Sequence, residues 1–238
     1  MSKRIYRVRS RGRPRRESGV TLVELAIVLA IVGVLTLVTA PSASRWQRDQ
    51  RLKGAARDVA DLLLLARAES ARTGDRHVVI FGPPGTADPS ANPIEAGGSP
   101  VPLLVLDDGA PGTANCRIDA GEAREVLMPV DGVAWGVTLA NARAPGDTGA
   151  AAFTPPQLSG STFANPANTA VPWFLFRPDG IPVRFEGQLG SCGTIGATAL
   201  GGGAFYLTNG TRDYAVVLTP MGGVRVHVWD GLAGAWKT

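Results

Sequence analysis

The chain has few of the residues that enzymes and metal proteins use. Its 238 residues include two histidines, two cysteines and 6% aromatic residues. The two cysteines are far apart, and with only His77 and His227 available they make a poor zinc site. The sequence has no Gly-rich phosphate loop and no Gly-x-Ser-x-Gly motif. It therefore predicts a protein that is not an enzyme and that has no cofactor and no metal.

Charge is almost absent from one long stretch near the start. Residues 20–40 read VTLVELAIVLAIVGVLTLVTA, and Glu24 is their only charged side chain. A run of this length spans a bilayer as a helix. A carboxylate in such a helix costs on the order of a few kcal/mol unless it finds a partner. Because no basic residue lies between Glu17 and Arg45, the counter-charge must come from outside this segment.

The residues around the start of this run resemble the type IV prepilin signal. In that signal a basic leader ends in glycine, a hydrophobic residue follows the cut, threonine comes next and glutamate is fifth. Gly19, Val20, Thr21 and Glu24 match these positions. The resemblance implies that a prepilin peptidase removes residues 1–19 and that the amine of Val20 is N-methylated. It also implies that Glu24 faces the amine of a neighbouring subunit in a filament, and that Pro41 kinks the long helix.

Two other interpretations of this segment remain. An ordinary secretory signal has a shorter apolar run with its cleavage site after it, and residues 42–44 would be a poor site of that kind. A plain membrane anchor would leave Glu24 without an explanation. The pilin-like interpretation predicts an inner-membrane protein with one span and a periplasmic head, which later enters a filament. Its partners would be prepilin peptidase, other pilin or pseudopilin subunits, the inner-membrane assembly platform and, before assembly, membrane lipid.

The positive charge of the chain belongs mostly to its leader. The formal net charge is +4, and removal of residues 1–19 takes away eight basic residues and one acidic residue, which leaves −3. A basic head holds the N-terminus in the cytoplasm. The charge is thus no indication of nucleic-acid binding. Arg212 and Arg225 are weak nucleic-acid candidates, because phosphate binding at physiological salt needs more contacts than this tail supplies.

The pattern beyond Pro41 predicts an α+β protein, a long N-terminal helix on a mainly antiparallel β head. Apolar residues recur at helical spacing from Leu52 to Ala66, so the helix is expected to run to about Arg72. The predicted segments are a leader (1–19), a transmembrane or filament-core half-helix (20–41), an amphipathic half-helix (42–74) and a β-rich head (75–238). Strands are expected at 77–81, 103–106, 125–128, 135–139, 173–176, 181–185, 204–208, 214–218 and 224–229.

Two turns and two long loops interrupt the predicted strands. Residues 177–180 and 221–223 are expected to close hairpins, whereas residues 82–100 and 140–172 are expected to be exposed, mobile loops. The order of these C-terminal pieces resembles the GspH/FimT family of minor pseudopilins and minor type IV pilins. That resemblance implies a subunit near the tip of a type II secretion pseudopilus or similar filament. The alternatives are a type IV minor pilin for adhesion or motility, or a DNA receptor in natural transformation.

The head offers one possible disulfide and one weak metal candidate. Cys116 and Cys192 both lie on the predicted periplasmic side, where an oxidising compartment favours a disulfide over two buried thiols. The acidic residues of 107–108 and 119–122 flank Cys116 and could converge on calcium, although their spacing matches no EF-hand and solvated turns are the simpler interpretation. The five tryptophans are expected to pack within the head.

Overall fold

The computed structural model describes residues 20–238 except 110–111 and 155–159, and it describes only the backbone of residues 37–41. The chain divides into two compact units that meet between Arg45 and Trp46. One α-helix and antiparallel β-sheets make up the described part, which confirms the predicted α+β class. The helix, α1, spans Leu22–Thr73, close to its predicted bounds. The leader that was predicted at residues 1–19 lies outside the described residues.

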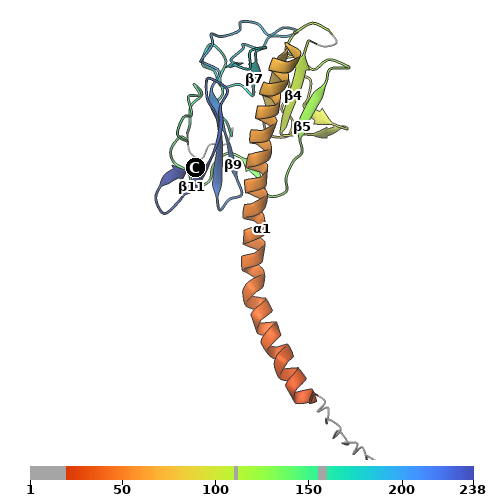
Figure 1. Ribbon diagram of the computed structural model, residues 1–238, viewed down its shortest axis with the longest axis vertical. Coiled ribbons are helices and arrows are strands. Elements are labelled where there is room, and N and C mark those ends of the chain that lie inside the picture. The colour runs from red at the N-terminus through yellow and green to blue at the C-terminus, as the bar shows by residue number, and fades with distance from the viewer. Residues whose placement is uncertain (1–19, 110–111, 155–159) are drawn as a thin grey trace, which may run out of the picture. The chain divides into compact units, whose positions relative to one another are not determined.

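Two five-stranded antiparallel sheets form the head (Figure 1). The strand order is β5-β4-β1-β7-β8 in the first sheet and β12-β11-β10-β9-β6 in the second, and β2 and β3 form a separate hairpin. The strands are β1 (Arg76–Phe81), β2 (Glu95–Ala96), β3 (Ser99–Pro100), β4 (Leu103–Asp108), β5 (Arg124–Leu127), β6 (Ala134–Trp135), β7 (Trp173–Phe176), β8 (Pro182–Val183), β9 (Gly203–Thr208), β10 (Asp213–Leu218), β11 (Val224–Asp230) and β12 (Ala235–Lys237).

The main core lies between the second half of α1 and the inner faces of both sheets. Leu52, Val59 and Leu63 of α1 are fully buried there, together with Phe81 of β1 and Phe205 of β9. The rings of Phe81 and Phe205 meet edge to face, with centroids 4.6 Å apart. The apolar stripe that the sequence places on this half of the helix is therefore covered by sheet, because helical spacing puts its members on one face. Figure 1 shows β4 and β5 on one side of α1 and β9 and β11 on the other.

The two long loops are only partly the exposed segments that the sequence predicted, because each also contributes buried residues. Residues 82–100 contain the β2–β3 hairpin, and Ile94 is buried against the outer face of the first sheet. In the second loop Phe163 is 2% exposed, and its ring stacks on that of Phe174 at 4.5 Å. Each sheet has an apolar outer face, and a loop covers it. A high content of Gly, Pro and Ala allows a loop to run across the face of a sheet, and it does not require that loop to be exposed to solvent.

Several strand predictions also need correction. Only Trp135 of the strand predicted at 135–139 lies in a strand, the strand predicted at 181–185 shortens to β8, and the sequence did not predict β2, β3 or β12. Beyond β6 the chain leaves the sheet, because the backbone amides of Thr138, Leu139 and Ala140 bond to the buried carboxylate of Asp213. A side chain 75 residues away thus replaces the strand partner of this segment. Local sequence patterns do not contain this information.

Candidate assembly site

The N-terminus of α1 is capped by the side chain of Thr21. The backbone amide of Glu24 donates to Oγ1 of Thr21 at 3.2 Å, and the amide of Leu25 donates to the Thr21 carbonyl at 3.1 Å. Thr21 is therefore the N-cap, and Glu24 is three residues further on, as in the Ser/Thr-x-x-Glu pattern. The resemblance to the prepilin signal implies only an assembly role for Thr21 and Glu24, and the structure adds this local one. The acidic Glu24 in the first turn also suits the positive end of the helix dipole.

The first turns of α1 expose apolar side chains on all sides. From Leu22 to Leu35 the large apolar residues are 51–84% exposed, and Val20 just before them is 74% exposed. Glu24 is the only charged residue in this stretch, and among the described residues no cation pairs with it. A helix that is hydrophobic all round requires an apolar environment or a partner on every side.

Two predicted features of this segment are not described by the structure. Gly19, the residue before the predicted cut, lies outside the described residues. Pro41 belongs to the backbone of α1, but the side chains of residues 37–41 are outside the described part, and so is the predicted kink. Within the part of the chain that is described, no helix is long and apolar enough to cross a membrane.

The two predicted turns converge on one arginine of α1. Arg67 donates from Nη1 to the Gly222 carbonyl oxygen at 3.0 Å, and the Arg67 side chain also packs against Gly180. Both glycines have positive φ, 72° at Gly180 and 79° at Gly222. A Cβ at Gly222 would lie 2.8 Å from the Gly180 carbonyl oxygen. The turns thus fix the helix to both sheets, which sequence reasoning could not foresee because the three residues are far apart in the chain.

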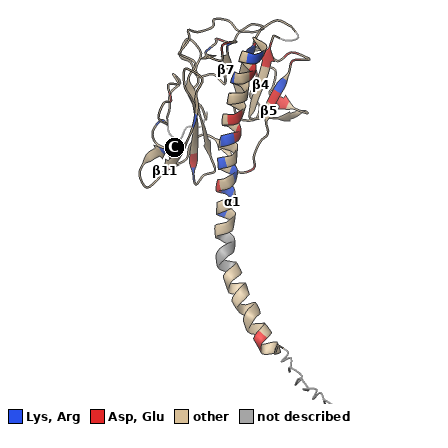
Figure 2. Cartoon of the chain, viewed as in Figure 1, with Lys and Arg blue, Asp and Glu red and all other residues tan. Residues whose placement is uncertain are grey.

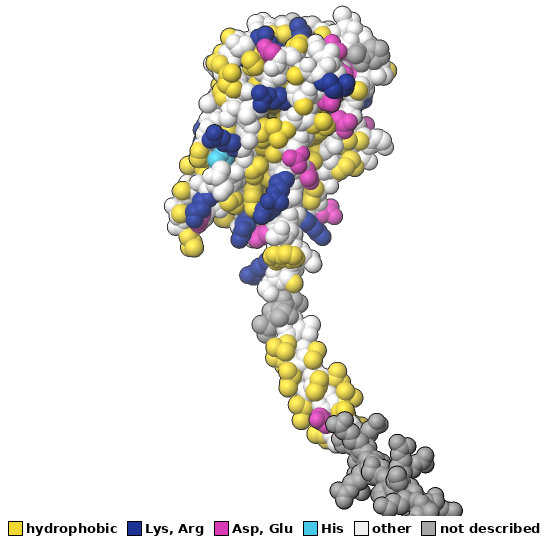
Figure 3. Space-filling model, viewed as in Figure 1, with side chains coloured by type: hydrophobic (Ala, Val, Ile, Leu, Met, Phe, Trp, Pro, Cys, Tyr) yellow, Lys and Arg dark blue, Asp and Glu magenta, His cyan; other side chains and the backbone are white. Residues whose placement is uncertain are grey.

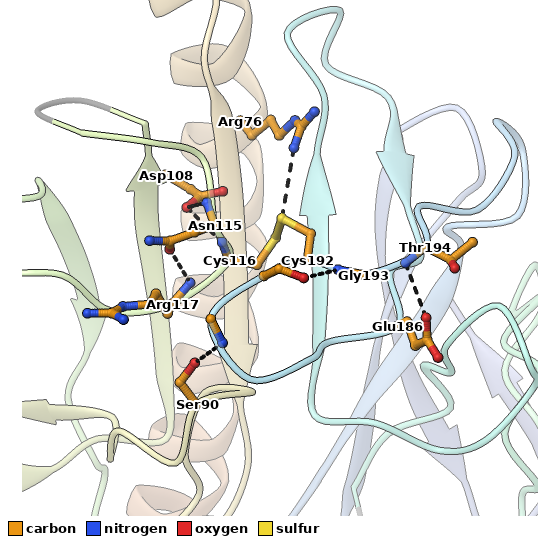
Figure 4. Close-up of a disulfide and its surroundings, with 12 residues drawn as sticks. Arg76, Ser90, Asp108, Asn115, Cys116, Arg117, Glu186, Cys192, Gly193 and Thr194 are labelled. Atoms are coloured by element: carbon orange, nitrogen blue, oxygen red, sulfur yellow. Dashed lines mark hydrogen bonds between the residues drawn. A yellow bond between two sulfur atoms is a disulfide. The ribbon is translucent and has the colours of Figure 1, made fainter.

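Cys116 and Cys192 form a disulfide that staples two loops over the first sheet (Figure 4). Their Cα atoms are 4.9 Å apart and 76 residues separate them. Both cysteines are buried in the cluster on the outer face of the sheet. Nη1 of Arg76 lies 3.8 Å from the Cys192 sulfur. The Asp108 carboxylate accepts from the backbone amides of Asn115 and Cys116, which positions the first cysteine.

The acidic residues near Cys116 are not the solvated turn that the sequence suggested. Asp108 is 1% exposed and Glu122 is 6% exposed. Burial raises the pKa of both carboxyl groups, against the opposing effect of the backbone amides that they accept from. Asp119 instead accepts hydrogen bonds from Asn115 and Arg117, and these hold its pKa low. These carboxylates thus mainly accept hydrogen bonds that fix the conformation of the loop around Cys116.

One group in the described part of the chain brings three potential metal ligands together, Asp108 with the sulfurs of Cys116 and Cys192. Those sulfurs are bonded to each other, so they offer no thiolate to a metal. The calcium interpretation would need several oxygens on one ion. The single group found in the described residues has one carboxylate oxygen.

The basic residues near the C-terminus are largely paired with carboxylates. Nε of Arg212 lies 3.0 Å from the Asp49 carboxylate, and Lys237 pairs with Asp230. Arg225 is exposed on β11. These residues therefore form no continuous run of free cations for a phosphate backbone, as far as the described residues extend.

Comparison with known proteins places one family motif on the chain. Residues 14–40 match the prokaryotic N-terminal methylation motif. The match covers the basic leader end, Gly19, Val20, Glu24 and the apolar run, and it supports a type IV pilin-like protein that prepilin peptidase processes and that assembles with other pilin subunits. No curated protein and no solved structure matches the chain.

Proposed function

We propose that the chain is a minor pseudopilin of the GspH/FimT type, a structural subunit of a type II secretion pseudopilus or a related type IV pilus-like filament. Prepilin peptidase cuts it after Gly19, and the mature chain begins at Val20. Before assembly the apolar helix anchors it in the inner membrane with the head in the periplasm. The protein acts as a subunit and not as an enzyme.

One observation carries this proposal: within the described residues, Glu24 has no cationic partner, and the first turns of its helix expose apolar side chains all round. A plain anchor would gain nothing from that carboxylate. In a filament, the amine of Val20 on a neighbouring subunit compensates it, and the apolar surfaces of neighbouring helices cover one another. The match of residues 14–40 to the methylation motif supports the same processing.

The GspH/FimT assignment rests on the C-terminal pieces. The turn at Arg177–Gly180 and the glycine pair at 222–223 precede strands of different sheets, and both turns pack on Arg67. A head built in this way suits a minor subunit, whose contacts with other subunits are made by loops at the end of a filament. A DNA-receptor role has less support, because Arg212 and Lys237 are already paired with carboxylates.

N-terminal mass spectrometry of the chain, recovered from membranes of cells with and without prepilin peptidase, tests the proposal. The expected mature chain starts at N-methyl-Val20 and disappears when the peptidase is absent. A chain that starts at Met1 in both strains, or one cut after Pro41, would contradict the proposal. Neighbouring genes distinguish a type II secretion system from a type IV pilus. Genes for a secretin and core pseudopilins indicate secretion, whereas a gene for a retraction ATPase indicates a pilus.

A further inference from the structure

A group of unpaired cations surrounds α1 at the base of the head. Arg48, Arg51, Lys53 and Arg57 lie within ten residues of α1, and Lys53 is the only one of them that is not fully exposed. None of the four pairs with a carboxylate in the described part of the chain, whereas Asp49 between them is bonded to Arg212. We call these four residues the basic collar. Figure 2 shows cations gathered on this stretch of α1, and Figure 3 shows dark blue side chains over the base of the head.

Large exposed apolar side chains lie beside the collar. Trp46 is 64% exposed, which corrects the expectation that all five tryptophans pack the head. Leu232, in the turn between β11 and β12, is fully exposed, and Leu139 is 47% exposed. Leu139, Leu232 and Arg212 line one open hollow.

Asp49 links this hollow to α1. It bonds to Arg212 at 3.0 Å and to the side-chain amide of Asn209 at 2.9 Å. The helical segment that carries Trp46 and the collar is therefore joined, through Asp49 and Arg212, to the hollow that Leu232 lines.

We propose that the collar, Trp46 and the Leu232 turn dock the head on an anionic bilayer before the subunit enters a filament. The inference rests on the proposed function, because it requires that residues 20–40 anchor the chain. Trp46 follows Ala40 by six residues, so it lies within about 20 Å of the end of the apolar run, however the chain is bent. An amphipathic tryptophan and long basic side chains are the residues that settle among lipid headgroups.

The charge distribution of the mature chain supports this partner. The mature chain carries a formal charge of −3, yet the collar alone concentrates four positive charges. Negative lipid headgroups attract basic side chains, and the attraction falls off within a Debye length of about 10 Å at moderate salt. Next to the collar, α1 turns acidic with Asp58 and Asp61, so attraction is confined to the base of the head. The attraction thereby holds the collar against the bilayer.

The test uses photo-crosslinking of the full mature chain in lipid vesicles. A benzophenone amino acid replaces Leu232, or replaces Leu189, which is 85% exposed on a different loop and serves as the matched control. The vesicles contain phosphatidylcholine alone, or phosphatidylcholine mixed with phosphatidylglycerol. Each basic side chain near an anionic surface raises membrane affinity about fivefold. Lipid labelling from position 232 should therefore be at least about fivefold higher in vesicles with phosphatidylglycerol than in phosphatidylcholine alone. Labelling from position 189 should not change.

A charge variant completes the test. Arg48→Gln/Arg51→Gln/Lys53→Gln should reduce labelling from position 232 to the phosphatidylcholine level. Arg72→Gln/Arg117→Gln/Arg177→Gln, which removes the same charge elsewhere, should not. Equal labelling in both lipids, equal labelling from both positions, or crosslinks to a second copy of the chain would each overturn the proposal. The vesicles contain neither peptidase nor filament, so an uncut leader in cells would refute the processing proposal without affecting this result. A chain that alkaline carbonate washes off the vesicles would refute the anchor itself.

Discussion

Glu24 has two roles that a substitution can separate. Its backbone amide completes the cap at Thr21, whereas its carboxylate has no partner among the described residues of the chain. Glu24→Ala leaves the backbone cap in place, and it leaves the predicted cut after Gly19 untouched. We expect normal cleavage but weaker incorporation into filaments, because the Val20 amine of the neighbour loses its counter-charge.

The fraction of the chain in purified filaments, compared with the membrane fraction, measures this effect. Glu24→Gln keeps the size of the side chain and should behave like Glu24→Ala if charge is the cause. Val34→Ala, in the same exposed apolar stretch, is a control for loss of side-chain volume. Normal incorporation of both Glu24 variants would count against the ion pair.

Gly222 provides a second test at the residue scale. Gly222 and Gly210 both have positive φ, 79° and 82°, but a Cβ at Gly222 meets Gly180 and Arg67 whereas one at Gly210 meets nothing within 4 Å. Gly210→Ala should cost about 1 kcal/mol from backbone strain alone. Gly222→Ala should cost about 1–3 kcal/mol more, because the helix contact must shift.

Denaturant unfolding of the two glycine variants measures the difference. An equal cost would mean that the Arg67 contact contributes little to stability. Arg67→Ala combined with Gly222→Ala should cost less than the two changes add up to, because both act on the same contact.

At the scale of elements, the disulfide joins two loops across the outer face of the first sheet. Loss of such a bond in a small domain costs about 2–5 kcal/mol. We expect Cys116→Ser/Cys192→Ser to lower the midpoint of thermal unfolding, and a reducing agent to lower that of the wild type to a similar value. The reducing agent should leave the double variant unchanged. If the wild type melted at the same temperature with and without reductant, the disulfide would not contribute to the stability of the head.

β11 contains a histidine whose titration should be visible in stability. His227 is 4% exposed, and neither ring nitrogen has a hydrogen-bond partner among the described residues; burial, together with the charge of Arg225, lowers its pKa. The unfolded chain therefore binds this proton more readily than the folded chain. The free energy of unfolding should fall as pH falls through the ordinary histidine pKa of 6.5 towards the lower folded value.

Comparison with His227→Gln isolates this contribution, since Glu122 and other groups titrate in both proteins. Denaturant unfolding at a series of pH values should give a steeper loss in the wild type than in the variant. Parallel curves would mean that His227 is not the group responsible.

The sequence predicted the helix and most strands because periodicity marks them locally. It also predicted the motif around Glu24, since spacing alone defines it. It did not predict the paths of the long loops, because buried carboxylates far away in the chain hold them. Asp213 accepts from three amides of residues 138–140, and Asp88 accepts from the amide of Ile118, 30 residues further on. An aspartate in a loop usually indicates a solvated turn, and only the tertiary fold shows that these are buried.

At the scale of the whole molecule, the proposed cut after Gly19 would change the charge as well as the length. The leader carries a net charge of +7 within residues 3–17, so its removal turns a basic chain with a pI of about 9.5 into one with a formal charge of −3. An uncut chain therefore keeps a strongly basic segment directly before the apolar run. In a filament, the basic leaders of neighbouring subunits would repel one another, and the Val20 amine proposed to pair with Glu24 would be absent.

Gly19→Leu tests this step. A large side chain before the cut should block the peptidase, so the chain should keep residues 1–19, run at a basic isoelectric point and stay out of filaments. Two-dimensional electrophoresis measures size and charge together. Gly12→Leu changes another glycine of the leader, away from the cut, and should be processed normally. If Gly19→Leu gave the acidic mature form, the cut would lie elsewhere, and the amine proposed to pair with Glu24 would not be that of Val20.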